Sequence, residues 1–489
     1  MAQSNIKKKF AFDVGWVFIS SVAATTILFL RRVFLARYLG PADLGLFSMC
    51  LTVSGIIGLI AGLGVEPAIV KYIAEYKDNR NRLNQIISSA VLILIFSGIF
   101  FGIVLFAISN ILADIFNMPQ LSFLLKIFAF MLPFTMITSV AFGIFNGLRK
   151  MNYFSYLNIT RTLFTFLIIV VLVLAGFGVK GAVFGYTFAE ILIACVLIVF
   201  ILTKKYVYLT FQNFKEIAKE LLSFGSRIFG ANAINMINYR ADIVLIGYFL
   251  TTTDVGYYAV AVGLSRFFWL IPRSVQTITY PATSEYWARK DHVALQKMID
   301  KSMKYTACIL LPIGLAVEFF AKDIVIFLFG NEFIYAVLPF QILLIGTVFS
   351  GVTNVPIGGS LAGTGRPDLA LKFSGVASLI NVVLNLCLIP ILGINGAAIA
   401  TTASLIVGAL VFLFLTIRIT SIKIDYKWYM KMFILLFIII LYFYIAEKFI
   451  NVYWIGSSGI IIFISLIFKT LLTRDDKNFF MSLFRSLRR

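Results

Sequence analysis

The stretch FGSRIFGANAINMINYRADIVLIGYF, residues 224–249, is long enough to cross a membrane but carries a line of polar side chains. At 100° per residue these side chains fall within less than half of the helix circumference. They are Arg227, Asn232, Asn235, Asn238, Tyr239 and Asp242. Because polar groups that face lipid are costly, this face is expected to meet protein or water inside the membrane. We interpret it as one wall of a translocation path.

The same region belongs to an internal repeat with an offset of about 210 residues. The matching pairs are Val14-Gly15 with Phe224-Gly225, Arg37 to Gly40 with Gly247 to Leu250, Asp43 to Phe47 with Asp254 to Tyr258, and Glu75-Tyr76 with Glu285-Tyr286. Late in each half, Gly178 to Ala182 matches Gly393 to Ala397. Two equivalent lobes are typical of alternating-access transporters, in which the substrate site lies between the lobes.

Composition places the chain in the membrane, since 61% of its residues are hydrophobic, 13% are charged and the mean hydropathy is +0.97. We count fourteen apolar runs of about 18 to 25 residues, each long enough to span a bilayer. Gly40-Pro41 is expected to separate the first two spans, and Pro272 to bend the eighth.

The predicted fold is therefore an all-α integral membrane protein of about 14 transmembrane helices. The predicted domains are an N-lobe of helices 1–6 (residues 1–203), a cytoplasmic linker (204–220), a C-lobe of helices 7–12 (221–420), and helices 13–14 with a basic cytoplasmic tail (421–489).

The net charge of +20 follows the sidedness expected of a membrane protein and gives no indication of nucleic-acid binding. Of the 42 basic residues, 30 fall in alternate connecting segments and the tail. Because Lys and Arg gather on the cytoplasmic side, both termini are predicted to be cytoplasmic. The expected location is the cell (plasma) membrane, with multiple crossings.

Seven basic residues lie inside predicted spans, and all of them are arginine although the chain has more lysines than arginines. They are Arg31, Arg32, Arg161, Arg227, Arg240, Arg266 and Arg273. A guanidinium binds phosphate or carboxylate through two parallel hydrogen bonds, so the pattern favours a cationic cavity for a polyanionic substrate. The alternative is that the arginines near span ends extend to the membrane surface.

The candidate site residues follow from these patterns. The substrate-binding candidates are Arg31, Arg32, Arg227, Asn235, Asn238, Arg240, Arg266 and Arg273. The ion or salt-bridge candidates are Asp242, Asn381, Asn385 and Thr402. Asp242 could pair with an arginine or bind a coupling proton or sodium ion, and Glu190 and Glu318 carry the same alternatives. Asn381 and Asn385 share a helix face and could bind sodium, or could hydrogen-bond to a neighbouring helix.

Signals of an enzyme are absent from the sequence, which has no P-loop, dinucleotide fingerprint, nucleophile elbow or metal-ligand spacing. We therefore expect no catalytic residue, no metal and no cofactor beyond a possible coupling Na+ or H+. Transport would be driven by an ion gradient, the membrane potential or the substrate gradient.

Three motifs carry a resemblance to a known family. They are Arg37 to Gly45 followed by Phe47, Ala241 to Phe249 around Asp242, and Val255-Gly256-Tyr257-Tyr258. With them the chain resembles the polysaccharide-type flippases of the multidrug/oligosaccharidyl-lipid/polysaccharide exporter superfamily. The resemblance covers nearly the whole length and implies a transporter that moves a lipid-linked oligosaccharide from the cytoplasmic to the outer leaflet.

By similarity to lipid II flippases, Arg31 or Arg32 and Arg266 or Arg273 would contact the pyrophosphate. The family's sodium site often includes an acid where this chain has Asn381 and Asn385, so sodium coupling would rest on amides alone. The implied partners are the lipid-linked oligosaccharide, membrane lipids and glycan polymerase or transferase machinery, with no nucleic acid and with the protein as a monomer.

Two other functions compete with this interpretation. A multidrug exporter of the same superfamily would move organic cations, which the embedded arginines would repel. A membrane glycosyltransferase or polymerase would need an acidic or metal-binding outer loop, which the sequence lacks. The residues do not distinguish an undecaprenyl from a dolichyl carrier, and they do not identify the glycan.

Overall fold

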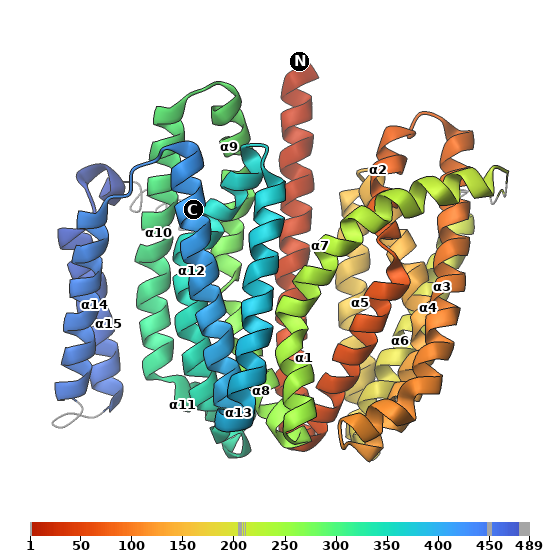
Figure 1. Ribbon diagram of the computed structural model, residues 1–489, viewed down its shortest axis with the longest axis horizontal. Coiled ribbons are helices and arrows are strands. Elements are labelled where there is room, and N and C mark those ends of the chain that lie inside the picture. The colour runs from red at the N-terminus through yellow and green to blue at the C-terminus, as the bar shows by residue number, and fades with distance from the viewer. Residues whose placement is uncertain (1, 204–207, 209, 211, 447–451, 479–489) are drawn as a thin grey trace. The chain divides into compact units, whose positions relative to one another are not determined.

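The computed structural model describes residues 2–203, 208, 210, 212–446 and 452–478. Within these ranges the regular elements are helices and no strand occurs (Figure 1). The first seven α-helices are α1 (Ala2–Gly62), α2 (Val65–Glu75), α3 (Arg80–Ile115), α4 (Pro119–Gly147), α5 (Met151–Leu172), α6 (Gly178–Thr203) and α7 (Phe214–Phe249), with a π-helical turn η1 (Val173–Phe177) between α5 and α6.

The second half of the chain is also helical. Its elements are α8 (Thr252–Phe267), α9 (Leu270–Ala288), α10 (His292–Phe319), α11 (Ala321–Phe329), the 3-10 helix η2 (Asn331–Ala336), α12 (Val337–Gly363), α13 (Pro367–Thr420), α14 (Tyr426–Ala446) and α15 (Val452–Thr470).

Eight helical stretches among the described residues are long and apolar enough to cross a membrane, or nine if the bent pair α8–α9 forms one span. The all-helical membrane architecture is thereby confirmed. Three of the eight, Gly15–Gly62, Met151–Ile201 and Asp368–Thr420, contain 48, 51 and 53 residues. One crossing needs about 20 residues, so each is long enough for two.

Each of the three long stretches contains a glycine with a non-helical backbone. Gly40 (φ 71°, ψ 178°) interrupts α1 just before Pro41, as the sequence predicts. Gly178 (φ 55°, ψ −142°) begins α6, and Gly393 (φ 61°, ψ −141°) interrupts α13. These positive φ angles favour glycine because they crowd a Cβ atom. The nearly equal angles at Gly178 and Gly393 show that the sequence repeat extends to backbone conformation.

The bend expected at Pro272 lies just before that residue. Helices α8 and α9 meet at 44° across Phe268 and Trp269. A proline ring collides with the carbonyl group four residues earlier, here that of Phe268, so Pro272 fits the first turn of a new helix and disfavours a continuous one.

By contact the chain divides into two compact units. The first unit is Met1–Val260, Leu328–Phe333 and Val382–Ala397, and the second is Ala261–Phe327, Ile334–Asn381 and Ala398–Arg489. In the first unit, α4 packs against α3 and α6, and α1 packs against α5. In the second unit, α12 packs against α9 and α10, and α14 packs against α15 (Figure 1).

Two glycines from matching positions of the repeat contact each other's helix in the first unit. A Cβ atom on Gly45 of α1 would lie 1.8 Å from the carbonyl oxygen of Thr252, and one on Gly256 of α8 would lie 1.9 Å from that of Pro41. Both distances are far shorter than any contact between nonbonded carbon and oxygen atoms, so only glycine permits this crossing. The motifs that define the repeat in sequence therefore form one close helix contact.

Candidate functional site

A buried ion pair joins α5 to α6 in the first unit. Arg161 donates from Nε to Oε1 of Glu190 over 2.7 Å. The Glu190 side chain is 1% exposed and that of Arg161 is 30% exposed. Ionisable groups inside apolar helices are costly and usually serve a function, so this pair is the first candidate site. The sequence left open whether Glu190 pairs with an embedded arginine or binds an ion, and it did not indicate that the arginine is Arg161.

Arg31 of α1 extends the pair into a cluster of opposite charges. Its guanidinium lies 5.4 Å from the ring centroid of Tyr186 in α6, a cation–π contact, and it interacts electrostatically with Arg161 and Glu190. Glu66 of α2 interacts with Arg161 in the same way. Of the predicted substrate-binding residues, Arg31 is the one that this cluster includes. Its neighbour Arg32 is half-buried on the same helix.

The polar line on α7 is in part anchored to the first unit's own helices. Arg240 donates from Nη1 to Oγ1 of Thr52 over 3.3 Å. Asp242 is 5% exposed and accepts a hydrogen bond of 2.7 Å from the hydroxyl group of Tyr258, which is itself buried. The role of Tyr258 was not anticipated, although it lies in one of the repeated motifs. Arg227 is exposed on the same helix.

Two predicted residues of this line, Asn235 and Asn238, have side chains that lie outside the described part of the structure. Their role in substrate binding stays a prediction.

The remaining predicted arginines belong to the second unit. Arg266 is half-buried in the last turn of α8. Arg273 is exposed on α9, with its guanidinium 6.0 Å from the ring centroid of Trp269. Both therefore flank the bend between α8 and α9.

One of the two amides proposed as sodium ligands, that of Asn381, hydrogen-bonds to the part of α13 beyond the break at Gly393. Asn381 is 2% exposed, and its side-chain nitrogen donates to the hydroxyl oxygens of Thr401 and Ser404, each over 3.2 Å. Thr402 donates to the backbone carbonyl of Ile342 over 2.7 Å, and Asn385 is fully buried. Among the described residues, no group of three or more His, Cys, Asp or Glu side chains could hold a metal ion.

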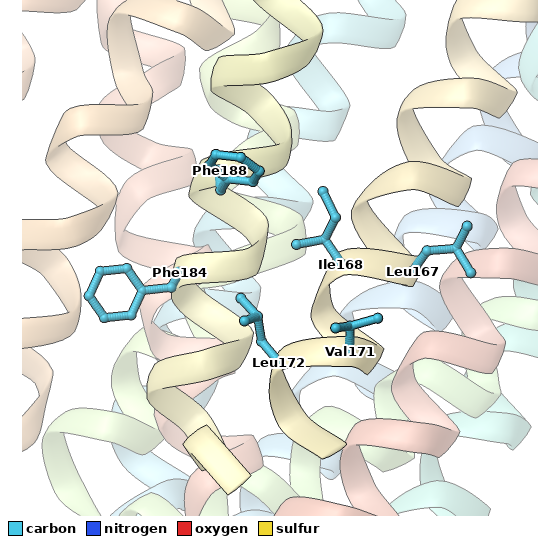
Figure 2. Close-up of a pocket in the computed structure, with 6 residues that line it drawn as sticks. All are labelled: Leu167, Ile168, Val171, Leu172, Phe184 and Phe188. Carbon is cyan, nitrogen blue, oxygen red and sulfur yellow. The ribbon is translucent and has the colours of Figure 1, made fainter. Parts of the chain in front are cut away.

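An apolar cavity of about 440 Å³ lies on the helix pair that carries Arg161 and Glu190. Figure 2 shows its lining, which comes from α5 and α6 and is entirely hydrocarbon. The lining residues are Leu167, Ile168, Val171, Leu172, Phe184 and Phe188. Because no polar atom lines it, this cavity can accept only the hydrocarbon part of a ligand.

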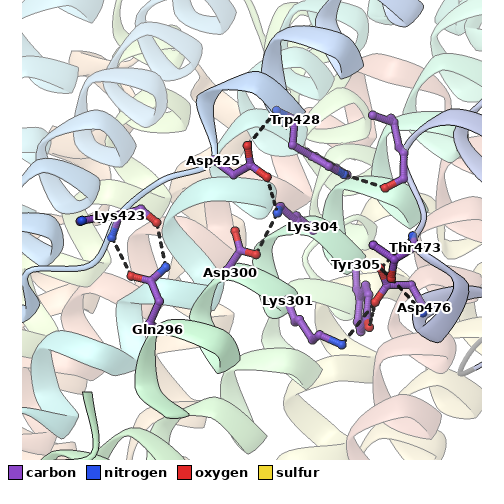
Figure 3. Close-up of polar contacts among 11 residues, drawn as sticks. Gln296, Asp300, Lys301, Lys304, Tyr305, Lys423, Asp425, Trp428, Thr473 and Asp476 are labelled. Atoms are coloured by element: carbon purple, nitrogen blue, oxygen red, sulfur yellow. Dashed lines mark hydrogen bonds and ion pairs between the residues drawn. The ribbon is translucent and has the colours of Figure 1, made fainter. Parts of the chain in front are cut away.

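A second polar cluster, the α10 cluster, joins α10 to the segments before α14 and after α15 (Figure 3). Lys304 lies 2.9 Å from Asp300 and 2.8 Å from Asp425. Asp476 receives a 2.6 Å hydrogen bond from Tyr305 and pairs with Lys301 at 3.3 Å. The same cluster includes a two-way contact between Gln296 and the backbone of Lys423, and a bond from the Trp428 indole to the carbonyl of Leu471.

Two carboxyl groups of the α10 cluster have lowered pKa values. A hydrogen bond from Lys304 lowers the pKa of Asp425. Burial alone would raise the pKa of Asp476, but hydrogen bonds from Thr473, Tyr305 and Lys301 outweigh it and lower that pKa to about 2. Both groups are therefore ionised at neutral pH, and they hold the last two helices to α10.

Apolar spans, an internal repeat and charges embedded in the spans are the features of a membrane transporter. The chain belongs to the family described as polysaccharide biosynthesis protein, which matches residues 34–338. This membership confirms the resemblance seen in the sequence.

Relatives and a solved structure extend the match to most of the chain. "Uncharacterized membrane protein MJ1068" of Methanocaldococcus jannaschii is 27% identical over 81% of each chain. "Probable low-salt glycan biosynthesis flippase Agl15" of Haloferax volcanii is 25% identical over 87% of this chain and 86% of the relative. The lipid II flippase MurJ in an inward closed conformation has the same fold, with a TM-score of 0.76, 18% identity, and coverage of 92% of this chain and 98% of that one.

Proposed function

We propose that the protein is a flippase for a polyprenyl-pyrophosphate-linked oligosaccharide, which it moves from the cytoplasmic to the outer leaflet during synthesis of a surface polysaccharide or glycan. The observation that carries this proposal is the family match over residues 34–338, a range that contains five of the seven embedded arginines. The name of the Haloferax relative and the fold shared with MurJ support a substrate of this class.

The chemistry of the substrate fits the residues present. A pyrophosphate is a compact polyanion, and arginine is the side chain best suited to bind it through parallel hydrogen bonds. The oligosaccharide needs polar partners, which the amide-rich face of α7 could supply. The polyprenyl chain needs hydrocarbon, which the lipid and surfaces such as the cavity between α5 and α6 provide.

The finer features of the proposal follow from the sequence. The three long stretches with glycine breaks would each cross the membrane twice, and α7, the α8–α9 pair and α15 would add three crossings, which gives fourteen. The lobes would comprise residues 1–203 and 221–420 and would alternate access, with both termini in the cytoplasm. An arginine-lined cavity would receive the headgroup, and Na+ or H+ could drive transport.

A multidrug exporter remains the second candidate, because members of the same superfamily include such transporters. The two functions require opposite charges on the substrate. Arginine side chains stabilise an anion and repel an organic cation in surroundings of low dielectric constant. Binding measurements can therefore separate them.

The test is a titration of purified full-length protein, in detergent, with a polyprenyl-pyrophosphate oligosaccharide and separately with an organic cation. We expect saturable binding of the pyrophosphate lipid, weakened about tenfold or more in Arg31→Gln because a hydrogen bond to a charged group contributes about 1.5–3 kcal/mol. Arg289→Gln is the matched control, since Arg289 is exposed and outside the spans. Binding of the cation instead, with no binding of the pyrophosphate lipid, would reject the proposal.

A further inference from the structure

Arg161 lies between two acidic side chains. Its Nε donates to Oε1 of Glu190 over 2.7 Å, and it also interacts electrostatically with Glu66 of α2. We call these three residues the Arg161 group. Two carboxylates and one guanidinium give the group a net charge of −1 when all three are ionised. The neighbouring guanidinium, that of Arg31, packs instead on the ring of Tyr186.

The Arg161 group has several polar atoms to offer to a ligand. A guanidinium has five N–H donors, and among the described residues Arg161 donates only from Nε. Glu190 is 1% exposed, yet its Oε2 accepts no hydrogen bond within the described part of the chain. Glu66 is exposed, with Ser139 of α4 as a polar neighbour. Donors and acceptors therefore lie next to each other, and a ligand can reach them.

The charges of the Arg161 group disfavour both a phosphate and an organic cation as its ligand. Its two carboxylates repel a phosphate, and the guanidinium groups of Arg161 and Arg31 repel a cation. A neutral hydroxyl group donates one hydrogen bond and accepts two, so it can bind a carboxylate and a guanidinium at once. Water can do the same, and the hydroxyl groups of a sugar can replace that water bond for bond. The chemistry therefore matches a neutral polyhydroxyl ligand.

We infer that the Arg161 group is the subsite for the sugar residue bonded directly to the diphosphate. Glu66 and Glu190 accept hydrogen bonds from the sugar hydroxyl groups, and the Nη groups of Arg161 donate to them. The inference rests on the proposed function and deepens it, because Arg31 is left to contact the diphosphate. Arg31 interacts electrostatically with Arg161 and Glu190, so the two subsites adjoin, as the covalent bond between phosphate and sugar requires.

The guanidinium of Arg161 is held in place without the use of its Nη groups. Its Nε is bound to Glu190, and its central carbon lies 5.9 Å from the ring centroid of Phe142 in α4, a cation–π contact. A side chain that is already ordered loses little conformational freedom when a ligand binds. Because hydrogen bonds to ionised groups are also about twice as strong as those between neutral groups, a few sugar hydroxyl groups suffice for recognition.

The experiment separates the contribution of the sugar from that of the diphosphate. Full-length protein in lipid nanodiscs is titrated with farnesyl diphosphate whose second phosphate carries glucose, galactose or N-acetylglucosamine. The reference lipid carries a methyl group there instead, so all four lipids have the same charge. The ratio of the affinities for a sugar lipid and for the methyl lipid is the sugar gain of each protein.

The variant is Glu66→Ala, which leaves Arg161 paired with Glu190. The matched control is Glu75→Ala, because Glu75 is an exposed acid on the same helix and pairs with Lys71. We expect wild type and Glu75→Ala to show a sugar gain for at least one sugar lipid, and Glu66→Ala to lose about tenfold of it. The methyl lipid should bind Glu66→Ala at least as tightly as wild type, since a negative charge has been removed.

A sugar gain that is absent in wild type for all three sugars, or unchanged in Glu66→Ala, would overturn the inference and leave the flippase proposal standing. If Glu66→Ala does not fold, Glu66→Gln decides in the same way with a smaller loss, because it keeps the size of the side chain and removes the charge. Failure of every protein to bind any of the four lipids would instead reject the diphosphate recognition on which both rest.

Discussion

The molecule contains two ion clusters with similar distances and very different surroundings. Arg161 and Glu190 lie 2.7 Å apart, and Glu190 is 1% exposed. Lys304 and Asp425 lie 2.8 Å apart, and Asp425 is 45% exposed. Water screens the second pair and supplies alternative partners, whereas the first has neither advantage. The comparison teaches that the length of an ion pair says little about its role, which depends on what surrounds the charges.

We expect the protein to fold when both charges of the Arg161–Glu190 pair are removed, but to be destabilised when only one of them is removed. Removing one partner leaves an uncompensated buried charge, while apolar replacement of both partners is often neutral or stabilising. The α10 cluster should behave differently, because each of its charges can return to water. The following predictions test this contrast, in order of decreasing effect.

The largest effect is expected for Arg161→Ala. This change leaves the buried Glu190 carboxylate without its cation and should lower the free energy of unfolding by about 3–5 kcal/mol. Thermal and denaturant unfolding of the purified protein measures it. The double variant Arg161→Leu, Glu190→Leu should recover most of the loss while failing to bind the pyrophosphate lipid. A double variant less stable than Arg161→Ala would contradict the buried-charge explanation.

A smaller and local effect is expected for Asp476→Ala. The change removes hydrogen bonds from Tyr305 and Thr473 and the contact with Lys301, which we expect to contribute about 1.5–3 kcal/mol together. Hydrogen exchange should increase in α15, the helix just before Asp476, and stay unchanged in α3 and α4. Asp475→Ala is the control, since Asp475 is adjacent and exposed. Equal exchange in both variants would show that the α10 cluster does not hold the last helices.

The same carboxyl group predicts a pH dependence. Folding lowers the pKa of Asp476 to about 2 from an unfolded value of about 3.9. The contribution of ionised Asp476 to the free energy of unfolding is therefore fully present above about pH 4 and is lost as the pH falls toward 2. Hydrogen exchange in α15, corrected for the intrinsic effect of pH, should be constant from pH 5 to pH 8 and rise below pH 4. A rise that persists unchanged in Asp476→Asn would assign the effect to another group.

The smallest effect is expected for Lys304→Met. Lys304 is 18% exposed and contacts two acids, but both lie close to water, so the loss should be about 0.5–1 kcal/mol and should shrink as salt is added. Unfolding at low and high ionic strength measures this loss of stability. The control is Lys297→Met, because Lys297 is exposed on the same helix. A loss as large as that of Arg161→Ala would remove the distinction between the two clusters.

Much of the fold could be predicted from the sequence because it depends on local patterns. Apolar runs indicated membrane helices, and Gly40-Pro41 marked a break that the structure contains at Gly40. The repeat was visible as matching motifs, but its physical consequence was not. That Gly45 and Gly256 contact each other's helix follows from the packing of α1 on α8, which no local pattern encodes.

The candidate site was harder to predict because side-chain partners come from distant positions. The sequence showed that Arg161 and Glu190 are embedded, yet 29 residues separate them and nothing local links them. The prediction gave more weight to the arginines of α1, α7, α8 and α9 than to Arg161. For Asn381 it left sodium binding and interhelical hydrogen bonding open, and the structure contains the hydrogen bonds.

The most direct test of the central proposal is leaflet exchange in liposomes. Purified protein is reconstituted with a fluorescent polyprenyl-pyrophosphate oligosaccharide, and the fraction reached by an external quencher is followed over time. Exchange that requires the protein, is abolished in Arg161→Leu, Glu190→Leu and is retained in Lys297→Met is the predicted result. No exchange by the wild-type protein, together with gradient-driven uptake of a cationic dye, would contradict the flippase proposal and favour a drug exporter.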